Sequence, residues 1–213
     1  MKNHSKAFRL AIQALFVALI AVQTMVPWLG YIPLGFLSIT IIHITVIVGA
    51  IMFGPGEGMV IGFTWGLFSL IRAYTAPSSP LDTLAFTNPL VSVVPRILIG
   101  LFAAWTFWAL FKLTHRQLVA SIGAAIIGTA TNTVLVLGAM GLIYSGQVAN
   151  FYNVSSGNLI KVLVGIVISN GIPEMIGAII LTPLLVRVLT TATHMIPWHV
   201  AALAKPAQLG THN

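Results

Sequence analysis

Charged residues are scarce in this chain of 213 residues: 6% are Asp, Glu, Lys or Arg, while 58% are hydrophobic. A soluble domain carries about 25% charged residues, so the chain has far less charge than a water-facing surface needs. No charged residue lies between Arg9 and Glu57, and none lies between Arg116 and Lys161. These absences exclude a water-soluble fold, a disordered chain and a nucleic-acid-binding protein. The sequence therefore predicts an integral membrane protein whose surroundings are a lipid bilayer.

Acidic residues and cysteine are scarcer still. The chain has 3 Asp and Glu against 10 Lys and Arg, a formal net charge of +7, and no cysteine. Without cysteine there is no disulfide framework, no thiolate metal site and no thiol nucleophile. The sequence motifs of P-loop ATPases, zinc proteases and serine hydrolases are absent as well. We therefore expect no enzyme activity, no catalytic residue, no metal site and no cofactor in this chain.

The apolar segments have the length of membrane-spanning helices. A bilayer core of about 30 Å needs about 20 apolar residues per helix, and Pro-rich and Gly-rich turns separate such segments here. The sequence predicts an all-α fold with one membrane domain over residues 1–213 and six transmembrane helices. The predicted spans are residues 9–26, 38–53, 58–74, 88–112, 118–144 and 158–189. Asn88 and Pro89 fit an N-cap and a first-turn proline at the start of the fourth span.

Basic residues predict the orientation of these helices. With the N-terminus inside, the inner face receives Lys2, Lys6, Arg9, Lys112, Arg116, Arg187 and Lys205. The predicted outer loops, residues 27–37, 75–87 and 145–157, contain no Lys or Arg. This positive-inside asymmetry predicts two cytoplasmic termini in a multi-pass protein of the cell membrane. Arg72 and Lys161 lie near outer helix ends, where long side chains can reach water.

Arg96 has no such explanation. It lies eight residues beyond Asn88, about 12 Å along the fourth span at 1.5 Å per residue, where an arginine costs about 2.5–3.5 kcal/mol. An ion pair with Asp82 or Glu174 is one explanation. The other is a binding site for an anionic group, because the planar guanidinium fits a carboxylate or a phosphate. With so few acidic residues in the chain, we favour the anion site.

Other polar features of the spans point to the same region. Pro95 leaves the carbonyl of Val91 without its helical donor and predicts a kink beside Arg96, and Pro173 does the same for Ser169. Broken helices near ionisable residues are typical of transporter ligand sites. Further mid-membrane candidates are Trp65, Asn132 and Asn170, with Gln23 and the lone His43 as weaker ones. Each alone fits an interhelical hydrogen bond; together with Arg96 they predict a small polar site open to the outside.

Small residues recur at three- or four-residue spacing along three spans. On the third and fifth spans they predict close helix packing within the bundle. These residues are Gly58, Gly62, Gly66, Ala120, Ala124 and Gly128. On the first span a stripe of alanines has the form of a docking face for another membrane protein. These residues are Ala7, Ala11, Ala14, Ala18 and Ala21.

Together these features resemble the substrate-binding S components of energy-coupling factor (ECF) vitamin transporters. The resemblance rests on six predicted helices in 213 residues, the absence of an ATPase motif, and an A-x-x-x-A motif at Ala14 and Ala18. Three segments are similar to the pantothenate-specific members: residues 31–54, SLIRAYTAPSSPLD at 69–82 and NPLVSVVPRILIG at 88–100. The resemblance extends over residues 8–190.

The resemblance implies a function and a set of partners. The chain would capture pantothenate from outside and deliver it inward. Its first helices, with Ala14 and Ala18, would dock on a transmembrane coupling protein, and two cytoplasmic ATPase subunits would hydrolyse the ATP. The predicted outer loops 27–37 and 75–87 would gate the site.

The chemistry of pantothenate agrees with the polar residues found independently. Arg96 would take its carboxylate, Asn132 and Asn170 its hydroxyl or amide groups, and Trp65 its apolar dimethyl portion. Arg72 and Tyr74 complete the predicted ligand-binding residues.

Three other functions remain open at this point. The chain could be an S component for another small anionic or neutral vitamin or precursor. It could be a proton-coupled secondary transporter with Glu174 as the proton carrier. A membrane enzyme acting on lipid head groups, with Arg96 and His43, is disfavoured because no nucleophile–base pair or metal cluster accompanies them.

Overall fold

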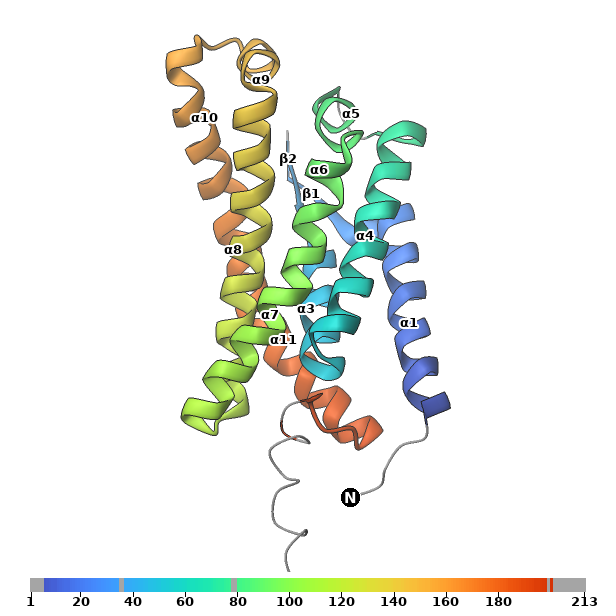
Figure 1. Ribbon diagram of the computed structural model, residues 1–213. Coiled ribbons are helices and arrows are strands. Elements are labelled where there is room, and N and C mark those ends of the chain that lie inside the picture. Colours follow the sequence, from blue (N-terminus) through green and yellow to red (C-terminus); the bar gives the residue numbers. More distant parts are fainter. Residues whose placement is uncertain (1–5, 35–36, 78–79, 199, 201–213) are drawn as a thin grey trace, which may run out of the picture.

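The computed structural model of the protein describes residues 6–34, 37–77, 80–198 and 200, and these form an elongated bundle of helices (Figure 1). Nearly all regular structure is helical, as predicted. The helices are α1 (Lys6–Met25), α2 (Pro27–Gly30), α3 (Ile42–Phe53), α4 (Pro55–Thr75), α5 (Pro80–Phe86), α6 (Pro89–Ser92), α7 (Val94–Thr114), α8 (Gln117–Ile143), α9 (Ser145–Phe151), α10 (Leu159–Ile166) and α11 (Ile172–Thr193). A 3₁₀ turn (Ser156–Asn158) precedes α10, and a π-helical turn (Val167–Gly171) joins α10 to α11.

Each predicted span corresponds to one helix or to an interrupted pair. The first, second, third and fifth correspond to α1, α3, α4 and α8, while the fourth is divided into α6 and α7 and the sixth into α10 and α11. Within the described residues, three stretches are long and apolar enough to cross a membrane, Pro89–Thr114, Gln117–Ile143 and Leu159–Thr193. Leu10–Met25 and Ile42–Phe53 are shorter apolar helices.

The connection between α1 and α3 differs from the prediction. In place of a loop over 27–37 and a helix from residue 38, α2 is followed by an antiparallel hairpin of β1 (Tyr31–Leu34) and β2 (Leu37–Thr40). Isoleucine and threonine in this segment favour extended backbone. The amide of Ile41 donates to the carbonyl of Gly30 at 3.1 Å and closes the base of the hairpin. As a result α3 begins only at Ile42. The predicted loops 75–87 and 145–157 likewise contain the short helices α5 and α9.

Helix α3 is the centre of the core. All twelve of its residues are buried, and it packs against α1, α4, α7, α8 and α11. A helix that is apolar on every side is stable only where neighbours surround it. The hairpin therefore leads directly from the surface of the bundle into its interior.

Gly62 and Gly66 of α4 lie in its contact with α7, and the close helix packing that their spacing predicted is present. A Cβ atom at Gly62 would collide with the backbone carbonyl of Arg96, and one at Gly66 would lie 2.7 Å from Cα of Val93. Since real Cβ atoms do not approach so closely, only glycine allows these two backbones to touch. The contact sets the position of the α7 backbone at Arg96.

Candidate ligand-binding site

Arg96 lies at the break between α6 and α7, and its side chain is only 5% exposed. Asn88 caps α6 as predicted, its side-chain oxygen accepting from the amide of Leu90 at 3.0 Å. The kink predicted from Pro95 is present as an interruption of the helix at Val93. Nη1 of Arg96 donates to the carbonyl of Val91 at 2.6 Å. The guanidinium thus satisfies the carbonyl that Pro95 leaves without a helical donor.

The two faces and one edge of this guanidinium have protein neighbours. Its Cζ atom lies 4.9 Å from the ring centroids of both Trp65 and Phe86, a distance typical of cation–π contacts. Nη1 is engaged by Val91, whereas Nε is buried and has no hydrogen-bond partner among the described residues. A buried donor of a charged group left unpaired is costly. The unpaired Nε of Arg96 is therefore a candidate hydrogen-bond donor to an anionic ligand.

Several other buried polar atoms also lack a partner within the described part of the chain. They include Nε1 of Trp65, Oγ of Ser69, Oγ1 of Thr129 and Oδ1 of Asn132. Trp65, 1% exposed, contacts Arg96 directly. Asn132 lies on α8, which packs against both α6 and α7. Because buried polar groups in proteins nearly always have partners, these atoms are candidates for hydrogen bonds to a ligand.

The hairpin contributes residues that the sequence did not single out. The guanidinium of Arg72, on α4, stacks over the ring of Tyr31 at 4.2 Å. The amide of Thr40 donates to Oε1 of Glu174, on α11, at 2.7 Å. Glu174 carries a charge opposite to that of Arg96 and is close enough to interact with it electrostatically. Arg72 is buried, so the expectation that its side chain reaches water is wrong: Tyr31 covers it.

Two predicted residues lie apart from this cluster. Tyr74 is 69% exposed, and its hydroxyl donates to the carbonyl of Thr87 at 3.4 Å. Asn170 is partly buried in the π-helical turn, where its side-chain oxygen accepts from the hydroxyl of Ser169 at 3.3 Å. Neither contact involves Arg96. Conversely, Phe86 and Tyr31 were missed, because an aromatic residue in a predicted loop carries no local sign of which helix it will contact.

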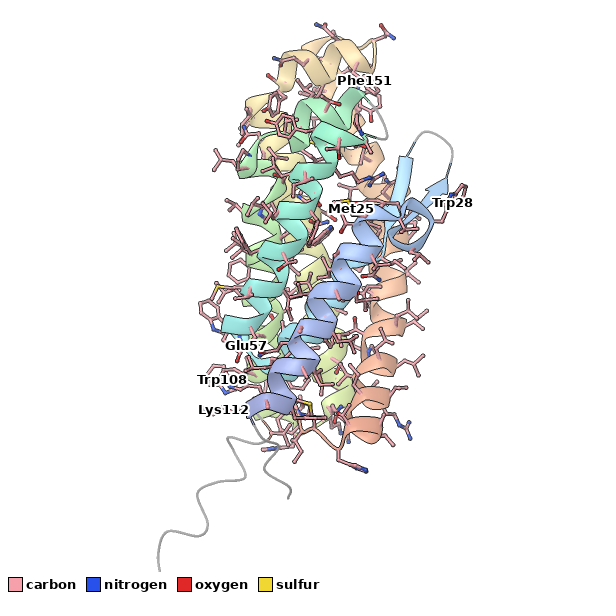
Figure 2. All side chains as sticks on the ribbon, turned by 90° about the vertical axis from the view of Figure 1, so that its right-hand side faces the viewer. Met25, Trp28, Glu57, Trp108, Lys112 and Phe151 are labelled. Carbon is pink, nitrogen blue, oxygen red and sulfur yellow. The ribbon has the colours of Figure 1, made fainter. Side chains whose placement is uncertain are left out.

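The first helix presents the predicted docking residues outward. Ala14 and Ala18 are both exposed on α1, while Phe16 and Ile20 on its other side are buried in the core. In Figure 2 α1 runs down the face of the bundle toward the viewer. Small exposed residues on such a helix allow close approach of another helix.

A bundle of apolar helices with a buried guanidinium and unpaired polar atoms is typical of a membrane protein that has a functional polar site. Residues 8–186 match the family of ECF transporter substrate-specific components. The chain belongs to this family. It is therefore an integral membrane protein that binds a substrate for a transporter, and it is not an enzyme.

Two curated relatives are similar over most of their length. The chain is 35% identical over 196 residues to the pantothenate transporter PanT of Leuconostoc mesenteroides subsp. mesenteroides, an alignment that covers 88% of this chain and 94% of the relative. It is 32% identical over 201 residues to the pantothenic acid transporter PanT of Lactococcus lactis subsp. cremoris, covering 88% of this chain and 96% of the relative.

Proposed function

We propose that this chain is the pantothenate-capturing subunit of an ECF-type importer. The observation that carries the proposal is the buried guanidinium of Arg96, which has an unpartnered Nε and two aromatic rings close to its Cζ atom. The two relatives named as pantothenate transporters supply the identity of the anion. Pantothenate has one carboxylate, which is the group that the free edge of an arginine binds best.

The remaining groups of pantothenate determine the other proposed contacts. Trp65 and Phe86 cover its dimethyl portion, because both rings already lie beside Arg96. Asn132, whose side-chain oxygen is unpartnered among the described residues, and Asn170 bind its hydroxyl or amide groups. Arg72 closes the site from the side of the hairpin. Tyr74, exposed at the end of α4, makes no ligand contact in this proposal.

The proposed membrane arrangement has six spans, formed by α1, α3, α4, α6–α7, α8 and α10–α11, with both termini in the cytoplasm. In support, the start of α1, the end of α11 and the α7–α8 turn lie at the same end of the bundle (Figure 1). Lys112 lies at this end (Figure 2), with its ammonium 5.5 Å from the ring centroid of Trp108. Lysine and tryptophan side chains are typical of the membrane interface.

The energy for uptake comes, in this proposal, from partners. The exposed face of α1 at Ala14 and Ala18 docks on a transmembrane coupling protein. Two cytoplasmic ATPase subunits hydrolyse the ATP, and this chain itself holds no cofactor. The β1–β2 hairpin and α5 are the elements that gate the site from outside.

Calorimetric titration of the purified protein with pantothenate, in the absence of nucleotide, tests the proposal. We expect one-to-one binding, and at least about a hundredfold loss of affinity in Arg96→Ala, because a buried carboxylate would lose its charged partner. Arg96→Lys keeps the positive charge but loses the planar guanidinium group. Its affinity for pantothenate should therefore lie between that of the wild type and that of Arg96→Ala. Arg187→Ala, an exposed arginine on α11, is the matched control and should bind normally.

The outcomes separate the parts of the proposal. Near-normal affinity in a folded Arg96→Ala variant would refute the carboxylate assignment. No binding to the folded wild-type protein would refute pantothenate as the ligand and direct the search to other small anionic or neutral vitamins. Uptake into vesicles that needs a proton gradient but no ATPase partner would contradict the ECF mechanism and favour a secondary transporter.

A further inference from the structure

The β1–β2 hairpin is held at its base by side chains from two different helices. Tyr31 and Thr40 face each other across the two strands. On one side, Arg72 of α4 stacks on Tyr31. On the other side, Glu174 of α11 accepts the hydrogen bond from the amide of Thr40. The same pair of hairpin residues is therefore fixed between α4 and α11.

The hydrogen bond between Thr40 and Glu174 is stronger than the stacking of Arg72 on Tyr31. It joins residues 134 positions apart, at a nitrogen–oxygen distance of 2.7 Å. Hydrogen bonds to a carboxylate are shorter and roughly twice as strong as bonds between neutral groups. Because it is made through the backbone of Thr40, it fixes the course of β2 whatever side chain residue 40 carries.

Glu174 is placed for this role by an irregular helix. The π-helical turn Val167–Gly171 and then Pro173, in the first turn of α11, immediately precede it. Widened turns of this kind occur often at functional sites. Glu174 is only 8% exposed, so ordering it there without a partner would be costly.

We propose that Glu174 is a positioning residue of the ligand site, which acts by holding the β1–β2 hairpin through Thr40. The inference rests on the proposed function, in which the hairpin gates the site that Arg96 defines. With the bond intact, Tyr31 stays beside Arg72 and the hairpin covers the bound ligand. With the bond lost, α11 no longer holds β2 through Thr40, and the ligand escapes faster.

A pair of variants separates the hydrogen bond from the charge. Glu174→Gln keeps a side-chain oxygen that accepts from Thr40, whereas Glu174→Ala removes it. We expect pantothenate to dissociate about tenfold faster from the alanine variant, as loss of one charge-assisted bond predicts. The glutamine variant should retain most of the slow dissociation. Stopped-flow tryptophan fluorescence measures both rates, and Glu57→Gln, at the other end of the bundle (Figure 2), is the matched control.

Hydrogen exchange of the hairpin amides in the ligand-free protein tests the same bond without a ligand. We expect the amide of Thr40 to be protected in the wild type and in Glu174→Gln and to exchange rapidly in Glu174→Ala. Unchanged protection in the alanine variant overturns the inference, as does equally fast dissociation from the glutamine and alanine variants. Lost protection without any binding of pantothenate to the wild type supports the role of Glu174 and refutes the proposed ligand.

Discussion

Replacing Gly62 by alanine tests whether the contact between α4 and α7 positions Arg96. A Cβ atom at residue 62 would meet the backbone carbonyl of Arg96, and it would lie 3.2 Å from Cα of Ile97. Both neighbours are helical backbone, which cannot turn aside as a flexible side chain does. The two helices must therefore separate, and the guanidinium of Arg96 must move relative to Trp65.

The expected magnitude follows from two opposing contributions. Overpacking of a close contact costs about 1–3 kcal/mol, and alanine gains up to about 1 kcal/mol over glycine in a helix. Gly56 lies on the same helix, and no atom lies within 4 Å of a Cβ atom placed on it. Gly56→Ala should therefore gain helix stability without any overpacking. Gly62→Ala should therefore be less stable than Gly56→Ala by about 1–3 kcal/mol. A displaced Arg96 loses a charge-assisted bond to the ligand. The affinity for the ligand should therefore fall about tenfold to a hundredfold.

Two measurements on the purified proteins check these values. Thermal unfolding followed by tryptophan fluorescence compares the stability of Gly62→Ala and Gly56→Ala with that of the wild type. Calorimetry with pantothenate then compares their affinities. If Gly62→Ala unfolds at the temperature of Gly56→Ala and binds as tightly as the wild type, the α4–α7 contact does not position Arg96 and the reasoning is wrong.

Two further predictions concern residues outside the buried cluster. Because Tyr74 is 69% exposed, Tyr74→Ala should change the affinity for pantothenate by less than about threefold, and a larger loss in calorimetry would bring this side chain into the site. Ala14→Trp combined with Ala18→Trp should leave binding of pantothenate by the isolated chain unchanged but prevent co-purification with the coupling protein. The exposed Ile176→Trp on α11 is the control for a bulky residue that faces lipid; equal co-purification of both variants would argue against docking through α1.

The local consequences of particular residues were predictable from the sequence. Pro95 has no N–H, so the interruption beside Arg96 follows from its chemistry alone, as does the cap at Asn88. The spacing of Gly58, Gly62 and Gly66 predicted a close helix contact. It did not predict that α7 is the partner, because a small-residue face accepts any helix that the fold brings to it.

The β1–β2 hairpin could not be predicted from the local sequence. Residues 31–40 are mostly apolar, and an apolar run this short is compatible with a strand or with the start of a helix. The extended conformation depends on contacts with residues far away in the sequence, which join Arg72 to Tyr31 and Glu174 to Thr40. Phe86 was missed for the same reason, since its contact with Arg96 depends on how α5 packs against α4 and α6.

The sequence by itself therefore determined the membrane class, the apolar helices and the presence of an arginine inside the fourth apolar segment. These depend on composition and on interactions within a few residues. Only the tertiary structure decided which side chains surround that guanidinium and which of its edges is free. Those answers depend on contacts between distant segments, as the bond between Thr40 and Glu174 across 134 positions illustrates, and the packing of the whole bundle selects them.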